Sequence, residues 1–383
     1  MTKTGAETHV ELARTLAERC GARPSPGGEK AFADAILARM RADGLLSVVV
    51  PETFGGPGLG VGDVARITFE IARHSGSAGL IYAMHMSQAL SVVRHGSGPF
   101  FEDFQRRMVR DAMLIASGTS EKGVGGDIFG SICTVEATDA PGVLTVSKES
   151  PNISYIDHAD AILVSANRMD AKGRKRQVLI AAEASDTEFS ATREAQFMGM
   201  RGILNKPWAL TARFPEAAIL DDHFPAIARA TMTPSIQIFW AALWSGIAAT
   251  ALDRAKLFVT REMSDDGEVT PVVRHELTRL VDRHYAMNAI IRDAIGEYEK
   301  GGAGGMEFGP AARINRVKVV CSRLLNEICL GALGIIGIRG YATGGPYSLA
   351  EPLADALSAP IMVSNYRLSM NNAKIEGFVE ETL

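Results

Sequence analysis

The part of the sequence best suited to bind a small polar ligand is residues 117–127, which read SGTSEKGVGGD. Hydroxyl groups donate and accept hydrogen bonds, and glycine lets the backbone approach a ligand closely, so this stretch could line a polar ring or a carbonyl group. Residues 152–154, which read NIS, have a similar polar character near a predicted strand. Ordinary surface loops share this composition, and the residues alone leave both interpretations open.

Several other site patterns are excluded by spacing. The glycines of residues 55–62 miss the G-x-G-x-x-G pattern, and those of residues 334–340 follow a predicted helix rather than a strand. His275 begins an H-E sequence, but Arg279 stands where a second zinc-binding histidine would be needed. We therefore expect neither a Rossmann nucleotide site nor a metal site.

Composition narrows the class of partner and the location. The net charge is −4 and the isoelectric point is about 6.1, so nucleic-acid binding is not expected. The four cysteines form no C-x-x-C pair and the N-terminus is polar, which favours a cytoplasmic protein. The longest apolar stretch, residues 236–251, is shorter than the roughly 20 residues that cross a bilayer, and it predicts a buried helix.

Periodicity divides the chain into three parts that must position these residues. Apolar residues recur at helical spacing in the first part, short alternating runs typical of strands follow, and long helical stripes return after residue 234. No helical pattern separates the strand-like runs, which favours an antiparallel sheet or barrel over βαβ units. The predicted domains are an N-terminal helical domain (1–113), a central β-barrel domain (114–226) and a C-terminal helical bundle (227–383).

Three stretches resemble segments of the acyl-CoA dehydrogenase superfamily, and the resemblance runs from about residue 44 to the C-terminus. Residues 44–60 are similar to its N-terminal signature, residues 120–127 to its T-E-P-x-A-G-S-D flavin loop, and residues 198–202 to the segment that closes its middle domain. The resemblance implies a mostly α fold with a central β domain: an N-terminal helical domain, a β-barrel and a four-helix bundle. It also implies a homodimer or homotetramer.

The same resemblance implies a flavin site, with FAD favoured and FMN open. Ser154, next to Ile153, would stand where the family has a threonine bonded to flavin N5, and Arg261 would reach the pyrophosphate of a cofactor held by a neighbouring subunit. The full set of cofactor-binding residues implied in this way is Ser117, Thr119, Ser120, Gly125, Gly126, Ile153, Ser154, Arg261, Gly337 and Asn365.

The catalytic base is the main departure from the family. Val363 occupies the usual position of the catalytic glutamate, and the alternative position falls near Ile236, so neither offers a carboxylate. His85, on a predicted apolar helix, is a candidate proton acceptor, although a buried structural histidine is the more common outcome.

Three activities therefore stay open. The first is α,β-dehydrogenation of an acyl-CoA or of an acyl group on a carrier protein, with a separate electron acceptor. The second is a flavin monooxygenase that uses reduced flavin from a partner reductase together with O₂. The third is a non-catalytic scaffold of the same fold.

Overall fold

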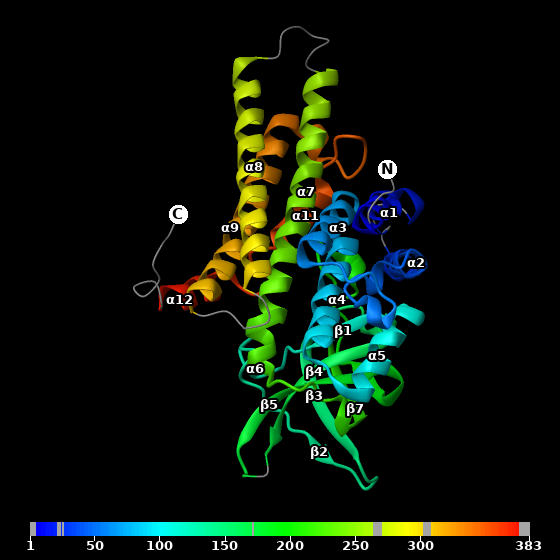
Figure 1. Ribbon diagram of the computed structural model, residues 1–383. Helices are drawn as coiled ribbons and strands as arrows, with labels where there is room; N and C mark the ends of the chain where they lie inside the picture. Colours follow the sequence, from blue (N-terminus) through cyan, green and yellow to red (C-terminus); the bar gives the residue numbers. More distant parts are fainter. Residues whose placement is uncertain are drawn as a thin grey trace.

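A computed structural model describes residues 5–20, 24, 27–170, 172–262, 270–301 and 308–374 of the chain. Figure 1 shows helices from the N-terminal part on one side, a β region at the lower end, and long C-terminal helices that extend away from it. The expected order of helices, strands and helices, and with it the fold class, is confirmed.

The N-terminal helices surround one helix that is buried on nearly all sides. That helix, α4, begins after Ser75, whose hydroxyl caps it by accepting a hydrogen bond from the backbone N–H of Ala78 at 3.3 Å. A helix that is buried all round belongs in a core, and nearly every residue of α4 from Gly76 to Val92 is buried. The five helices are α1 (Gly5–Cys20), α2 (Glu29–Ala42), α3 (Val61–His74), α4 (Gly76–His95) and α5 (Gly98–Arg110).

The central β region consists of two sheets rather than one closed barrel. One sheet has the order β1-β4-β5 and the other the order β2-β3-β7-β6. All neighbouring strands are antiparallel except β1 and β4, which are parallel and are joined through β2 and β3 instead of a helix. The strands are β1 (Ile115–Gly118), β2 (Glu136–Ala137), β3 (Val143–Ile153), β4 (Ala161–Met169), β5 (Lys175–Glu183), β6 (Thr187–Ala191) and β7 (Lys206–Pro215).

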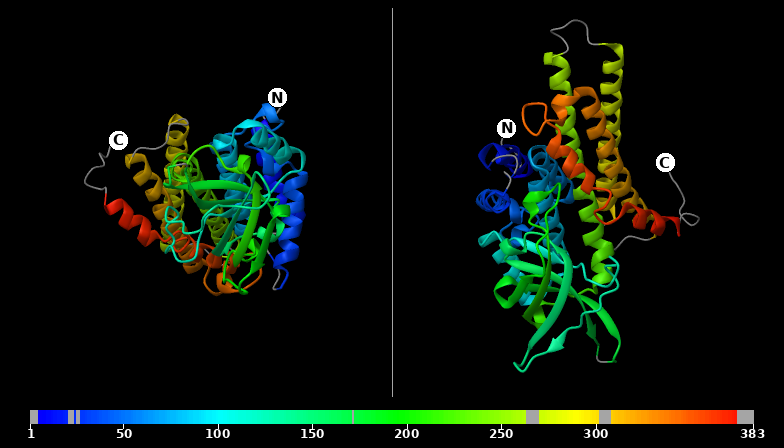
Figure 2. Two further views of the ribbon diagram at one scale, coloured as in Figure 1. Left: turned by 90° about the horizontal axis from the view of Figure 1, so that it is seen from below. Right: turned by 180° about the vertical axis from the view of Figure 1, so that it is seen from behind.

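Three long helices form the C-terminal part, and short helices pack against them. In place of a fourth long helix, α11 and α12 lie against α9, where Asn326 donates to the carbonyl of Ala356 and Asn315 donates to Asn372. Figure 2 shows α12 on the side opposite the N-terminal helices. The helices are α6 (Phe224–Ile227), α7 (Thr233–Glu262), α8 (Pro271–Lys300), α9 (Phe308–Ile336), α10 (Ile338–Tyr341), α11 (Ala350–Ser358) and α12 (Asn365–Ala373).

Glycine allows α7 to pack closely against the N-terminal helices. A Cβ atom at Gly246 would lie 2.5 Å from the carbonyl oxygen of Phe69, and one at Gly79 would lie 2.8 Å from the side chain of Leu243. Side chains at these positions would force the helices apart. The apolar face of α7 is therefore buried by α3 and α4, as expected for residues 236–251.

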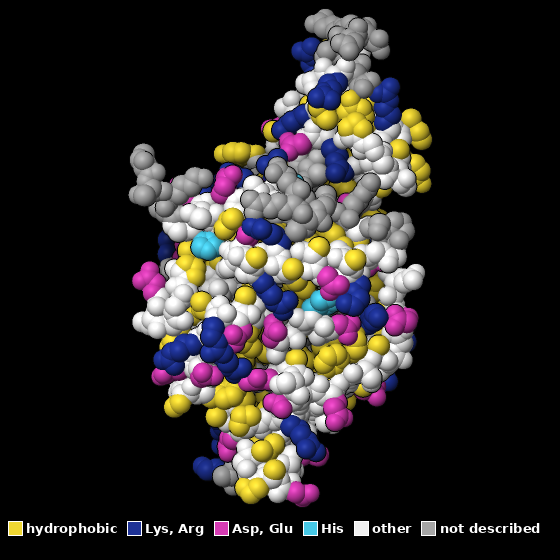
Figure 3. Space-filling model, turned by 90° about the vertical axis from the view of Figure 1, so that its right-hand side faces the viewer, with side chains coloured by type: hydrophobic (Ala, Val, Ile, Leu, Met, Phe, Trp, Pro, Cys, Tyr) yellow, Lys and Arg dark blue, Asp and Glu magenta, His cyan; other side chains and the backbone are white. Residues whose placement is uncertain are grey.

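Within the residues that the structure describes, two helical stretches are long and apolar enough to cross a membrane by length and composition alone. They are residues 224–261, whose most apolar window is 89% buried, and residues 312–336, whose window is 44% buried. The burial of the first is that of a core helix in a globular fold. On the face that carries the N-terminal helices, positive and negative side chains are interspersed (Figure 3).

Candidate functional site

The predicted ligand-binding hydroxyls lie where β1 ends. The hydroxyls of Ser117 and Thr119 are 3.1 Å apart, and both residues are partly exposed. Ser120 instead faces β3: its hydroxyl lies 2.6 Å from that of Ser150 and donates to the carbonyl of Asn152 at 2.9 Å. Ser117 and Thr119 therefore bond to each other, whereas Ser120, which is also partly exposed, ties the loop to the second sheet.

The loop that follows β1 contains glycines with positive φ, and it contacts α6 and α12, the first and last helices of the C-terminal part. Gly125 and Gly126 have φ of +61° and +79°, a conformation that favours glycine. The Arg367 guanidinium of α12 donates to the carbonyl of Gly125 at 3.3 Å and also to that of Gly126. The Phe129 ring lies 6.4 Å, between centroids, from the Phe224 ring of α6. We name residues 122–130 the glycine loop.

Arg367 is a site residue that the sequence did not point to. It lies more than 240 positions from the glycines that it contacts, and only its closeness to Asn365 hinted at a role. The contact depends on how α12 packs against the β region, which periodicity alone does not specify.

A buried ion pair fixes the start of the glycine loop. Glu121 accepts hydrogen bonds from the Ser131 hydroxyl and from the backbone N–H groups of Ile132 and Cys133, and it lies 3.6 Å from the ammonium of Lys148. Burial alone would raise the pKa of Glu121, but the Ser131 hydroxyl, the charge of Lys148 and the two amides together hold it below its usual value. These contacts give Glu121 a structural role.

The segment that contains Ile153 and Ser154 forms an irregularity in β3. The pairing of β3 with β7 shifts register between Ser150 and Ile153, which is a β-bulge. The side chain of Ile153 is buried, and its carbonyl accepts a hydrogen bond from the Trp208 indole at 3.2 Å. Ser154 is only 5% exposed, so a ligand would reach its side chain only from inside the fold.

The turn before α12 carries the position where the family has its base. Val363 has φ of +47° and is 37% exposed, and no carboxylate replaces the missing glutamate at this position. Asn365 is directed to α9: its Oδ1 accepts from the Lys318 ammonium at 2.7 Å, and its Nδ2 donates to the Ser322 hydroxyl at 2.9 Å. The geometry therefore does not support a direct cofactor contact for the Asn365 side chain.

Arg261 and Gly337 lie away from the glycine loop within one chain. Arg261 is exposed in the last turn of α7, whereas the glycine loop contacts α6, just before the other end of α7. A helix of 30 residues is about 45 Å long at 1.5 Å per residue, and Figure 1 shows α6 at the end of α7 opposite to its last turn. Gly337 begins α10 with φ of +69°.

His85 is wholly buried in α4, and both of its ring nitrogens are engaged. Nε2 lies 2.7 Å from the carbonyl oxygen of Leu46, and Nδ1 accepts a hydrogen bond from the backbone N–H of Ile115 at 2.9 Å. Burial lowers the pKa of His85 to about 4. Neither nitrogen is left for a substrate, so the geometry is that of a structural histidine rather than of the proposed proton acceptor.

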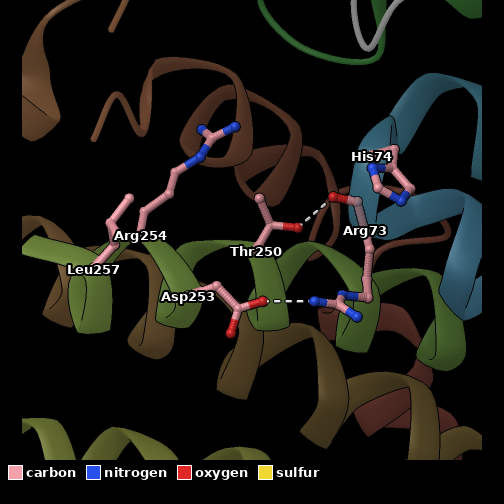
Figure 4. A pocket seen from close by; sticks show the side chains of 6 residues that line it. All are labelled: Arg73, His74, Thr250, Asp253, Arg254 and Leu257. Atoms are coloured by element: carbon pink, nitrogen blue, oxygen red, sulfur yellow. Dashed lines mark hydrogen bonds and ion pairs between the residues drawn. The ribbon is translucent and has the colours of Figure 1, made fainter. Parts of the chain in front are cut away.

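An open pocket of about 290 Å³ lies elsewhere, between the end of α3 and the middle of α7 (Figure 4). Arg73 and Asp253 form an ion pair of 2.7 Å across it, and Thr250 donates to the carbonyl of Arg73. Its remaining lining residues are His74, Arg254 and Leu257. None of them belongs to the glycine loop or to the turn before α12. No group of three or more potential metal ligands occurs among the described residues.

Comparison with known proteins agrees with the fold. Residues 8–110 match the family model of the acyl-CoA dehydrogenase N-terminal domain. A mitochondrial isovaleryl-CoA dehydrogenase from Arabidopsis thaliana is 28% identical over 163 residues, which span 41% of this chain and 38% of that protein.

Two solved structures share the whole fold. Butyryl-CoA dehydrogenase from Megasphaera elsdenii superposes with a TM-score of 0.81, at 19% identity over 98% of both chains. FMN-bound TdsC from Paenibacillus sp. A11-2 also gives a TM-score of 0.81, at 20% identity over 97% of this chain and 96% of its own. Residues 8–110 thus match the N-terminal domain of the acyl-CoA dehydrogenases, and the whole chain shares the fold of butyryl-CoA dehydrogenase.

Proposed function

We propose that this protein is a flavin-dependent oxidoreductase that removes hydrogen from the α and β carbons of an acyl thioester, either an acyl-CoA or an acyl group on a carrier protein. The observation that carries the proposal is the position of the glycine loop, which follows the hydroxyls at the end of β1 and is joined to α12 by Arg367. This arrangement occurs in a chain with the fold of the acyl-CoA dehydrogenases.

The residues at the end of β1 fit the polar edge of a flavin ring. Such an edge needs both donors and acceptors, and the partly exposed hydroxyls of Ser117 and Thr119 supply both. A Cβ atom at Gly125 would meet nothing within 4 Å, so space lies open in front of this backbone. A bound flavin would supply the two-electron acceptor, and FAD is favoured over FMN by the resemblance.

The exposed end of α7 and the exposed start of α10 could bind part of the flavin from another subunit. Arg261 could pair with a pyrophosphate, because a guanidinium binds phosphate oxygens in a bidentate manner. Since Arg261 lies far from the glycine loop of its own chain, we propose that Arg261 and Gly337 serve the flavin of a neighbouring copy.

A flavin-dependent monooxygenase is the second candidate. Two observations favour it: Val363 provides no base for removing the α proton, and the fold matches TdsC, whose structures are described as those of a dibenzothiophene monooxygenase, one of them FMN-bound. In this case a partner reductase would supply reduced flavin, and O₂ would be the second substrate.

Identification of the cofactor, followed by a test of whether a substrate reduces the bound flavin, tests both activities. We expect purified protein to release FAD or FMN on denaturation, and we expect a thioester from an acyl-CoA or acyl-carrier panel to remove the visible flavin absorbance without oxygen. If no thioester does so, but a product carries oxygen from isotopically labelled O₂, the monooxygenase is supported instead. Colourless protein that binds neither flavin would contradict both activities and favour a non-catalytic scaffold.

A further inference from the structure

Lys318 is a buried lysine in the C-terminal part that no activity considered above uses. It lies on α9 with 0% exposure, and its ammonium is 5.7 Å from the centroid of the Trp244 ring. Nζ donates to the carbonyl of Ala359 at 3.0 Å and to Oδ1 of Asn365 at 2.7 Å. Within the described part of the chain, no carboxylate forms an ion pair with it.

Both of these acceptors belong to the turn between α11 and α12. Asn365 is the first residue of α12, and Ser322, one turn after Lys318 on α9, also bonds to its amide: the hydroxyl donates to Oδ1 at 3.2 Å and accepts from Nδ2 at 2.9 Å. The amide of Asn365 is thus held entirely by α9. Lys318 therefore fixes both ends of the turn, at Ala359 and at Asn365.

The turn contains a strained residue that needs such support. Val363 has φ of +47°, which costs free energy for a β-branched residue and persists only where neighbouring contacts enforce it. Ser364 caps α12 by accepting from the backbone N–H of Arg367 at 3.4 Å. The side chain of the same residue, Arg367, donates to the carbonyls of the glycine loop. A continuous set of contacts thus runs from Lys318 to that loop.

The surroundings of Lys318 oppose its positive charge. Burial, together with the nearby charge of Arg367, lowers the pKa of Lys318 to about 7. On its own helix, burial raises the pKa of the Cys321 thiol to about 12, so this group stays neutral. From α7 the Trp244 ring faces Lys318, and the Asp355 carboxylate of α11 is bonded to the backbone of Met200.

We propose that Lys318 is a positioning residue of the flavin site, which locks the turn that contains Val363 against α9 and so sets where α12 meets the glycine loop. The proposal rests on the proposed function for the identity of the ligand. The claim that Lys318 holds the turn in place does not depend on the ligand, because the contacts from Lys318 to Arg367 are all made within the protein.

A double-mutant cycle in the flavin-free protein tests whether Lys318 holds the turn in place. We expect Lys318→Met to speed amide hydrogen exchange in residues 359–367 by about tenfold, because two buried hydrogen bonds to the turn are lost. Asn365→Leu should do the same, and the double variant should exchange more slowly than two independent effects would predict, because the bond between Lys318 and Asn365 is lost only once. Lys256→Met, which removes an exposed lysine of α7, serves as the control and should leave this segment unchanged. Additive effects, or no change in Lys318→Met, would overturn the proposal.

A charge substitution at the acceptor separates positioning from general structural support. Asn365→Asp gives Lys318 a counter-ion, which should raise the pKa of the lysine and move the pH dependence of hydrogen exchange in this turn to higher pH. Flavin affinity, measured by fluorescence quenching, should follow the same shift. An unchanged pH profile in Asn365→Asp would contradict the proposal. If wild-type protein binds no flavin while the exchange data behave as expected, the proposed function fails and the positioning role stands.

Discussion

The two ring nitrogens of His85 link α4 to Leu46 and to the start of the first sheet, and their loss should affect stability rather than chemistry. We expect His85→Leu to lower the free energy of unfolding by roughly 2–4 kcal/mol, because the carbonyl of Leu46 and the N–H of Ile115 lose their partner inside the core. Urea denaturation measures this change. Flavin content per folded molecule should stay near the wild-type value.

The sign of the pH dependence at His85 follows from its lowered pKa. Since the folded pKa of about 4 lies below the value of 6.5 in the unfolded chain, its contribution is complete above pH 6.5 and is lost as the pH falls toward 4. His85→Leu should lack this part of the acid destabilisation. If His85→Leu had normal stability but no turnover, His85 would instead act in proton transfer.

Asp355 should give the opposite pH dependence. Its carboxylate is buried between α11 and the Met200 backbone, and burial raises its pKa from 3.8 to about 7. The raised pKa favours the protonated folded state, so this contribution is complete below pH 3.8 and is lost as the pH rises to 7.

The substitution Asp355→Asn keeps an acceptor for the Met200 N–H and removes the titration. We expect the variant to gain stability relative to wild type as the pH rises, by at most about 4 kcal/mol above pH 7. Thermal unfolding between pH 4 and 8 measures the difference. Asp139→Asn, at an exposed position, is the control and should leave the pH profile unchanged. If the stability of wild type and of Asp355→Asn changed with pH in the same way, other contacts would already offset the cost of burying the ionised carboxylate.

At the scale of elements, the glycine loop offers a matched pair of substitutions. Gly125 and Gly142 both have positive φ, +61° and +75°, and a Cβ atom at either would meet nothing within 4 Å. Alanine at each position should therefore cost a similar amount of stability, about 1 kcal/mol, through backbone strain.

Only the first of these two substitutions should affect the ligand. We expect Gly125→Ala to weaken flavin binding, because its Cβ would project into the open space before the loop, whereas Gly142→Ala in the β2–β3 turn should bind flavin as wild type does. Calorimetry of flavin binding to both variants makes the comparison. If the two variants bound flavin with equal affinity, Gly125 would not be part of the flavin site.

The sequence predicted elements well where local patterning decides them. The helical spacing over residues 29–42 coincides with α2, and the alternating runs at 143–146, 161–164 and 178–181 fall within β3, β4 and β5. The parallel pairing of β1 with β4 was not predicted, because β1 is only four residues long, both strands are mostly buried, and nothing in their pattern encodes the direction of a partner.

The candidate site was predictable in part. The hydroxyls and glycines at 117–126 could be recognised from composition and resemblance; in the structure the hydroxyls of Ser117 and Thr119 lie side by side at the end of β1, and Gly125 and Gly126 have positive φ. The contacts of Lys318 and Arg367 were not predicted, because they depend on the packing of the short helices α11 and α12 against α9 and the loop. A lone lysine in a helical stripe is more often taken as part of a solvated face.

At the scale of the whole molecule, exposed apolar side chains gather around the junction of α9 and α10. Leu330, Ile338 and Tyr341 are 55%, 80% and 72% exposed. Large apolar side chains exposed near one another are typical of a protein interface. We therefore expect this region to be buried between copies of the chain in a homodimer or homotetramer.

Light scattering coupled to size exclusion tests this expectation. Ile338→Glu should shift the protein toward smaller species, because a charge would be buried in the interface. Met169→Glu makes the same change at the end of β4, where the side chain is 49% exposed, and should leave the mass unchanged. A monomeric wild-type protein would contradict the assembly.

The length of α7 has a genetic consequence. If Arg261 serves the flavin of a neighbouring copy, as proposed, each site is built from two subunits; because Arg261 stands about 45 Å of helix away from the end of α7 that meets the glycine loop, damage at the two ends would then spoil different halves of that site. Two such alleles, each of which gives an inactive protein by itself, should complement one another when expressed together. A mixed assembly contains one site built wholly from intact halves. Two alleles damaged at the same end should not.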